Sequence, residues 1–522
     1  MSNTKSLAKA ASVIMVATLV GRFVGFIREM VIANQFGASV HTDAYVVAYT
    51  IPSMVAMALA GAFNAAFLPV FNDYLVSRDR GEANNLANTT INLVAVFFIT
   101  LITAAFVLSP YIVKLLAPGF DRASLALTAK LFRIILPALL FIGLMGLISA
   151  ILNSYRHFLF PALGPMITSL VTIGFVLALG RRWGIASLAA GTMVGFAAQF
   201  LFQLPVMWKK GFQYRLIISW SHPGVKKTLW LMLPVVLGVI IGQAPVFVER
   251  GLASTLEAGS ISALNYANRV MQLPLGLFVA AISIPVFPAL SVYASKREYG
   301  QLKETLIRGI SLFFLILVPA AVGLLTLNKP IIKLLFEHGE FTVHNTVVTA
   351  NALAYYALAI IPWALRDILT RSFYALQDTV TPVLIAAVGA MATVLFDLLL
   401  VKIMGVGGLA LGLALGLSAN VLLLYVYLRR KLGKIFPAHW LLTLGKIISA
   451  GAVMALVTAM LYNLLGSYVP DSSRQGLLLK ILLAGAAGVL VYFFGLLLLK
   501  VREIADLTGL IIKLKDKMLK SR

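Results

Sequence analysis

Apolar segments long enough to cross a lipid bilayer alternate with short polar stretches along the whole chain. A transmembrane helix needs about 20 consecutive, mainly apolar residues. The pattern therefore predicts an all-α polytopic membrane protein with fourteen transmembrane helices. The predicted segments are residues 8–36, 44–71, 90–114, 128–153, 159–180, 184–208, 228–248, 260–291, 305–327, 347–374, 380–402, 406–428, 442–466 and 476–499.

Three sequence motifs recur with an offset of roughly 220 residues. The repeated pairs are residues 51–71 and 273–290, 110–120 and 330–341, and 153–161 and 374–382. Both members of each matching pair are odd-numbered or both are even-numbered in the order of spans, so they cross the membrane in the same direction. This predicts two six-helix lobes as parallel repeats, at residues 1–220 and 221–435. Two such lobes around a central cavity are expected of an alternating-access transporter, and a duplicated scaffold without transport is the alternative.

The end of the chain lies outside this repeat. Two further apolar helices are expected within residues 436–500. In residues 501–522, apolar side chains recur at helical spacing with lysines around them. This pattern is typical of an amphipathic helix on an anionic cytoplasmic membrane surface, and a solvated chain end is the alternative.

The charged residues predict the orientation of the chain. Of its 522 residues, 60% are hydrophobic and only 12% are charged, yet the formal net charge is +24. In a membrane protein such an excess of lysine and arginine marks cytoplasmic loops, so it does not imply a nucleic-acid partner. Every second loop along the chain is rich in lysine and arginine, and these loops lie on the same side of the membrane as both termini. We therefore expect a multi-pass membrane protein with both termini in the cytoplasm.

Enzyme signatures are missing from the sequence. It contains no GxxxxGK[ST] loop for ATP, and its six histidines lack a metal-ligand spacing such as HExxH. The absence of cysteine excludes disulfides and thiolate metal sites. We expect a protein that is not an enzyme and holds no cofactor or structural metal.

Charged residues interrupt the first apolar segment at Arg22, Arg28 and Glu29. An arginine at the centre of a spanning helix costs about 2.5–3.5 kcal/mol and almost always faces a cavity or a partner. Gly21 and Gly25 would let a neighbouring backbone approach, or let the helix break. We interpret this segment as one wall of a cationic cavity. An Arg28–Glu29 ion pair that only holds helices together is the alternative.

Arg269 interrupts the eighth segment, in the other predicted lobe. Guanidinium groups suit phosphate because they are permanently charged and bind it bidentately. Three arginines in one cavity would need water or an anionic ligand, which predicts a polyanionic substrate. Snorkelling of Arg269, or its pairing with Asp43 or Glu249, is the alternative.

Asp397 lies within the eleventh segment, one turn after Thr393. A carboxylate near hydroxyl or backbone oxygens can bind Na⁺ or a proton inside a membrane. The pair is therefore a candidate ion site for Na⁺ or H⁺ coupling, and a hydrogen-bonded packing role is the alternative.

The chain carries the motifs Gly21-Arg22-x-x-Gly25-Phe26-x-Arg28-Glu29, Phe36-Gly37-Ala38, Thr42-Asp43-Ala44-Tyr45, Ile51-Pro52, Gly61-Ala62-Phe63, Ala66-Phe67-Leu68-Pro69, Tyr266-Ala267-Asn268-Arg269-Val270-Met271 and Pro274-x-Gly276. These motifs resemble those of the bacterial lipid II flippase family, MurJ or MviN, of the multidrug/oligosaccharidyl-lipid/polysaccharide exporter superfamily. Sister families of drug and polysaccharide exporters lack the arginines of the first motif.

The resemblance implies transport of lipid II, the undecaprenyl-pyrophosphate-linked disaccharide-pentapeptide, to the outer leaflet of the bacterial cytoplasmic membrane. Membrane lipids and other cell-wall synthesis proteins are the further partners expected. The two extra helices would form a groove for the lipid tail, and Asp397 with Thr393 would belong to a sodium site that some members have. The positions that would contact the head group, or be needed near it, are Arg22, Arg28, Glu29, Asp43 and Arg269.

Three rival functions remain open. A related polysaccharide-lipid or multidrug exporter would share the fold, but a drug-cation exporter should carry carboxylates in place of the arginines. A membrane enzyme acting on polyprenyl phosphates would need paired acidic or histidine residues at one interface. A non-transporting scaffold for cell-wall synthesis would tolerate loss of all three arginines.

Overall fold

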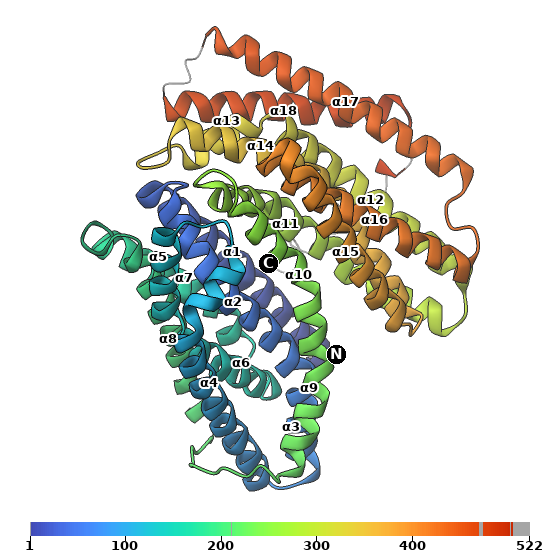
Figure 1. Ribbon diagram of the computed structural model, residues 1–522. Helices are drawn as coiled ribbons and strands as arrows, with labels where there is room; N and C mark the ends of the chain where they lie inside the picture. The colour runs from blue at the N-terminus through green and yellow to red at the C-terminus, as the bar shows by residue number, and fades with distance from the viewer. Residues whose placement is uncertain (1, 210, 469–472, 502, 505–522) are drawn as a thin grey trace. The chain divides into compact units, whose positions relative to one another are not determined.

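The computed structural model describes residues 2–209, 211–468, 473–501 and 503–504. Throughout these residues the regular structure is helical, which confirms the predicted all-α fold class (Figure 1). The predicted amphipathic helix at residues 501–522 falls almost wholly outside the described residues.

The number of membrane spans is close to the predicted number. Among the described residues, 12 spans are long and apolar enough to cross a membrane. A thirteenth is counted if Ser260–Val279 and Ala281–Ser295 of α11 (Ser260–Ser295), bent by 44°, form one span. The first helix, α1 (Ser2–Phe36), has 35 residues but is not among these spans. The polytopic prediction is confirmed, whereas the count of fourteen is not.

The chain forms two compact units. The first comprises Met1–Ser262 and His338–Thr342, and the second comprises Ala263–Glu337 and Val343–Arg522. After α1, the helices of the first unit are α2 (Val40–Ala62), the π-helix η1 (Phe63–Phe67), α3 (Leu68–Ser77), α4 (Arg80–Leu116), α5 (Arg122–Ile135), α6 (Ala138–Ser154), α7 (Leu159–Trp183), α8 (Ile185–Lys209), α9 (Pro223–Gly242) and α10 (Ala244–Ala253). The predicted lobes, residues 1–220 and 221–435, divide the chain at other positions than these two compact units do. The lobes stay a prediction.

The second unit contains most of α11 and all later helices. These are α12 (Tyr299–Thr326), α13 (Asn328–Phe336), α14 (Val343–Ala375), α15 (Val380–Met404), α16 (Val406–Leu432), α17 (Ala438–Gly466) and α18 (Arg474–Leu498). The last two pack against each other, and α17 also packs on α12 (Figure 1). At the second contact, Trp440 donates its indole N–H to the Ser311 hydroxyl at 3.0 Å. A groove for a lipid tail at these helices stays a prediction.

Large aromatic and aliphatic side chains fill the interior of the first unit. One cluster surrounds the fully buried Phe132 of α5. A second surrounds η1 and α3, where the rings of Phe67 and Phe71 stack at 5.4 Å. Such burial stabilises each large side chain by roughly 1.5–3 kcal/mol where water is the alternative environment. These two clusters hold α2 and α8, which carry part of the candidate site.

The internal repeat is visible in the backbone. Helices α7 and α15 each have 25 residues and begin at residues 159 and 380, which are 221 positions apart. The turns before them have the same unusual conformation, because Arg156 and Gln377 both have φ of 60°. The turns after them match as well, with φ of 55° at Gly184 and 53° at Gly405. Non-glycine residues rarely adopt positive φ, so these shared turns indicate a common ancestral fold for the two segments.

Candidate functional site

Arg28 of α1 lies next to Glu29 in a largely buried ion pair. Its Nη2 donates to the Glu29 Oε1 at 2.7 Å, and the two side chains are 17% and 6% exposed. The Arg28 Nε–H is also buried, and it has no hydrogen-bond partner among the described residues. The ion pair that sequence analysis held as an alternative is thus present, and the Nε–H of the same guanidinium is buried without an acceptor among the described residues.

Two tyrosines of α2 lie near this guanidinium, and α8 holds both of them. Arg28 interacts electrostatically with Tyr45 and Tyr49 of α2, whose rings stack at 5.9 Å. The Tyr45 hydroxyl forms a hydrogen bond of 2.8 Å with the Thr192 hydroxyl of α8. The Tyr49 ring lies 6.5 Å from that of Phe196, one turn further along α8. The ion pair with Glu29 and the burial of both side chains fix the position of the Arg28 charge and exclude most competing water.

Arg22 lies on the same helix but in a different environment. Its side chain is exposed, whereas that of Arg28 is mostly buried. Helix α1 continues unbroken through Gly21 and Gly25, and these glycines lie against α7. A methyl group added at Gly25 would lie 3.8 Å from the Ser169 hydroxyl, an ordinary contact. The glycines therefore support helix packing rather than a break in α1.

The Asp43 carboxylate, in the first turn of α2, accepts three hydrogen bonds. The Gly259 N–H and the Ser262 N–H each donate at 2.7 Å, and the Ser262 hydroxyl donates at 2.5 Å. Asp43 is 2% exposed, so its charge is stabilised by these donors at the beginning of α11. In this conformation, Asp43 holds the end of the α10–α11 loop against α2.

Arg269 lies on α11 in the second unit and is half-buried. On the same helix, Tyr266 is 1% exposed and its ring lies 5.2 Å from that of Phe336. Helix α11 is thereby fixed against α13 at the turn that precedes Arg269. The meeting of Arg269 with the two arginines of α1 in one cavity stays a prediction.

Asp397 and Thr393 lie one turn apart on α15, and both face α16. They are 1% and 6% exposed. A Cβ at Gly412 would lie 3.0 Å from the Asp397 backbone nitrogen, and a Cβ at Gly416 would lie 2.7 Å from the Thr393 Cα. The backbone of α16 therefore approaches both polar residues closely. This seam provides a carboxylate and a hydroxyl, which are oxygen ligands of the kind that Na⁺ prefers.

The α7–α8 seam, 221 positions earlier, also places glycines of one helix against the other. Its contacts are shifted by about one turn, because Gly191 faces Phe175 and Thr172 and Gly195 faces Thr168. Gly191 and Gly195 of α8 take the places of Gly412 and Gly416, and the buried Thr172 takes the place of Thr393. The position equivalent to Asp397 is Val176, which is also fully buried. The equivalent position in the first half of the chain therefore carries no ionisable group, and the carboxylate of Asp397 belongs to the α15–α16 seam alone among these two seams.

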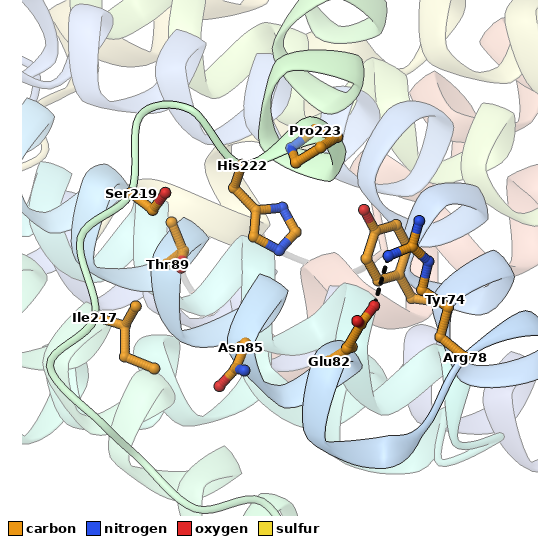
Figure 2. A pocket seen from close by; sticks show the side chains of 9 residues that line it. All are labelled: Tyr74, Arg78, Glu82, Asn85, Thr89, Ile217, Ser219, His222 and Pro223. Carbon is orange, nitrogen blue, oxygen red and sulfur yellow. Dashed lines mark hydrogen bonds and ion pairs between the residues drawn. The ribbon is translucent and has the colours of Figure 1, made fainter.

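Sequence analysis missed a cavity of about 350 Å³ in the first unit (Figure 2). It lies among α3, the beginning of α4 and the segment at residues 211–222 that precedes α9. Its lining includes His222, which sequence analysis gave no role because the histidines lack a metal-ligand spacing, and Thr89, which lies just before the predicted segment 90–114. The available signal was the pair Asn88 and Asn92, whose one-turn spacing just before an apolar run suits binding of another chain segment.

Comparison with known proteins identifies the family. Residues 32–477 match the family model described as "Lipid II flippase MurJ". The "Lipid II flippase MurJ" of Burkholderia cenocepacia is 32% identical over 452 residues, covering 84% of this chain and 87% of that protein. The "Probable lipid II flippase MurJ" of Vibrio cholerae is 30% identical over 514 residues, covering 96% of this chain and 97% of that protein.

Solved structures agree with the sequence comparison. A structure described as "Lipid II flippase MurJ, inward closed conformation" has a TM-score of 0.79 at 26% identity, covering 92% of this chain and 97% of that one. An inward-facing multidrug resistance MATE transporter of the MOP superfamily has a TM-score of 0.69 at 16% identity, covering 80% of this chain and 98% of that one, and shares the fold alone. The chain therefore belongs to the lipid II flippase MurJ family.

Proposed function

We propose that this protein moves lipid II from the inner to the outer leaflet of the cytoplasmic membrane by alternating access. The observation that carries the proposal is the family match over residues 32–477. Relatives named as lipid II flippases align with most of the chain, so the proposal concerns the whole protein. The chain is a multi-pass membrane protein of the bacterial inner membrane. The structural similarity to the MATE transporter is not evidence for a drug substrate, because at 16% identity it concerns the fold alone.

Arg28 is the first residue that we propose for head-group binding. Its buried Nε–H needs an acceptor, and a pyrophosphate oxygen is a strong one. Glu29 fixes the guanidinium plane through the 2.7 Å bond, so the open donor has a defined direction. Arg22 and Arg269, one exposed and one half-buried, would add positive charge for the same head group. Asp43 would act by holding the α10–α11 loop, because its carboxylate already accepts three hydrogen bonds.

A complementation experiment tests the role of Arg28. In cells depleted of their own lipid II flippase, Arg28→Ala should reduce outward exposure of lipid II at least about tenfold, because a hydrogen bond to a charged group contributes roughly 1.5–3 kcal/mol. Arg28→Lys should retain part of the activity, since it keeps the charge but loses the planar fork. Arg308→Ala is the matched control, because Arg308 forms an exposed ion pair with Glu304. Normal exposure of lipid II in membrane-inserted Arg28→Ala would contradict this role and favour a scaffold.

Coupling to Na⁺ or H⁺ through Asp397 and Thr393 is the second part of the proposal. It is supported by the burial of both side chains against α16 and by the repeat, in which the position equivalent to Asp397 is the uncharged Val176. Asp397→Asn keeps the size of this side chain and should abolish any dependence of lipid II exposure on a sodium or proton gradient. If the gradient dependence persists in this variant, the ion is bound elsewhere.

Both termini are proposed to lie in the cytoplasm, on the side of the basic loops. Other cell-wall synthesis proteins would then approach the substrate from the side where lipid II enters. The helices α17 and α18, beyond the repeated part of the chain, are proposed to accommodate the lipid tail.

A further inference from the structure

Three charged residues lie close together on α14, in the second unit. Arg366, Asp367 and Arg371 fall within the membrane span Val343–Ala375. The side chains of Asp367 and Arg371 are 30% and 35% exposed. Charged side chains within a span almost always face the interior of a helix bundle or water. This face of α14 therefore meets water rather than acyl chains.

Two of the three charges neutralise each other. The Arg371 Nε–H donates to the Asp367 carboxylate at 2.8 Å, and the Ser283 hydroxyl of α11 donates to the same oxygen at 2.6 Å. The Arg371 guanidinium also lies 5.9 Å from the centre of the Phe287 ring of α11. Asp367 and Arg371 thus fasten α14 to α11, and their charges cancel.

Arg366 carries the remaining charge, and its donors are accessible. The side chain is half-buried, and its guanidinium makes no hydrogen bond with another described residue. None of its three nitrogens is among the fully buried polar atoms that lack a partner, so a ligand can reach each of them. The adjacent Asp367 attracts Arg366 electrostatically, but that carboxylate is already bonded to Arg371 and Ser283. An arginine in this situation needs water or an anion.

Trp363, one turn earlier on α14, holds the Arg366 guanidinium in place. The central guanidinium carbon lies 4.9 Å from the centre of the Trp363 ring. Stacking on an aromatic ring uses the flat face of a guanidinium, so the in-plane N–H groups stay open. The indole N–H of Trp363 also makes no hydrogen bond among the described residues and is not fully buried. The two side chains therefore present several N–H donors side by side.

A single open guanidinium suits a carboxylate. Two arginines and one aspartate leave a net charge of +1 on this face of α14. Arginine binds a carboxylate bidentately, through two parallel N–H···O bonds. A diphosphate carries more negative charge and is better matched by several arginines together. The chemistry of this face thus favours a carboxylate as its ligand.

The position of this face relative to Arg269 indicates which part of a long substrate it meets. Ser283, which bonds to Asp367, comes fourteen residues after Arg269 on α11. Fourteen residues make nearly four helical turns and about 21 Å, so Arg269 leaves α11 on about the same side as Ser283. The 44° bend in α11 shortens this distance. An extended peptide of five residues spans up to about 17 Å.

We propose that Arg366 and Trp363 bind the carboxylate at the free end of the lipid II pentapeptide. This inference rests on the transport of lipid II proposed above, with the diphosphate at Arg269. A sugar separates the peptide from the diphosphate, so an extended head group reaches from Arg269 to Arg366. Arg366 lies nine residues before the end of α14, about 14 Å from its cytoplasmic end in the proposed orientation. The peptide would then lie in the cytoplasmic half of the span while the diphosphate is bound deeper.

Native mass spectrometry of the full-length protein in detergent tests this subsite with two ligands. One is lipid II, and the other is lipid II in which a carboxamide replaces the terminal peptide carboxylate. We expect the carboxylate form to bind at least about tenfold more tightly, because its hydrogen bonds are charge-assisted. Arg366→Gln should bind both forms as the wild type binds the carboxamide. Arg366→Lys should keep part of the preference, since it retains the charge but loses the planar fork.

Arg430→Gln is the matched control for this experiment. Arg430 also lies over an aromatic ring, 5.2 Å from the centre of Tyr427, but it is exposed near the end of α16. Its variant should keep the wild-type preference for the carboxylate form.

Three results would overturn the subsite. The first is equal binding of both forms by the wild type, and the second is a preference that persists in Arg366→Gln. The third is weaker binding of both forms by Arg366→Gln than the wild type shows for the carboxamide, because Arg366 would then act on a part of the head group that the two forms share. Absence of any lipid II binding by the wild type would instead overturn the proposed function, and this subsite with it.

Discussion

Asp43 shows how a single buried charge is stabilised within this protein. Its three donors come from Gly259 and Ser262, more than 200 positions later in the chain. The sequence predicted an important acidic residue near the end of a span, but it gave no sign of these partners. The reason is physical, because the donors are mainly backbone N–H groups, which every residue except proline carries.

The substitution Asp43→Asn should loosen the beginning of α11. An amide presents only one oxygen to three donors, and its own NH₂ faces a backbone N–H, so we expect a loss of about 2 kcal/mol in the local opening free energy. Hydrogen exchange at the Gly259 and Ser262 amides should then become roughly 30-fold faster. Thr255→Ala, at an exposed position of the same loop, is the control. Unchanged exchange at both amides would mean that the three hydrogen bonds do not hold the loop.

At the scale of helices, the glycine seams between α7 and α8 and between α15 and α16 set the packing. The bounds of these helices were predicted within a few residues, because long apolar runs that end at polar turns define where a membrane-spanning helix begins and ends. Sequence analysis did not predict which glycines face a neighbour, since forty glycines are spread through the chain. The choice depends on helix rotation, which is fixed by tertiary contacts such as the approach of Gly416 to Thr393.

Gly416→Ala should separate α15 from α16. The new Cβ would lie 2.7 Å from the Thr393 Cα, and backbone atoms cannot move away as a flexible side chain can. We expect destabilisation of about 1–3 kcal/mol, measured as a lower thermal unfolding midpoint in detergent. At Gly174 of α7, no atom lies within 4 Å of an added Cβ, so Gly174→Ala should be neutral or slightly stabilising. Equal effects of the two alanines would show that the seam is not tightly packed.

At the scale of the whole chain, the repeat is the feature that sequence predicts best. Motifs 153–161 and 374–382 correspond to turns in which Arg156 and Gln377 share the same positive φ. Duplication preserved the backbone, whereas individual side chains diverged, as Val176 and Asp397 illustrate. The cavity lined by Thr89 was not predictable in this way, because it depends on the path of residues 211–222, which is fixed by hydrogen bonds to Asn88 and Asn92 and by the burial of Phe212.

The orientation of the chain is a whole-molecule property that labelling can measure directly. The sequence contains no cysteine, so each introduced cysteine is the sole thiol. Ser467→Cys, after α17, should react with a membrane-impermeant maleimide in intact cells, because its loop lies on the side with few basic residues. Ser295→Cys, exposed beside Lys296 and Arg297, should react only after permeabilisation. The reverse pattern would invert the membrane sidedness of every loop and contradict the cytoplasmic placement of both termini.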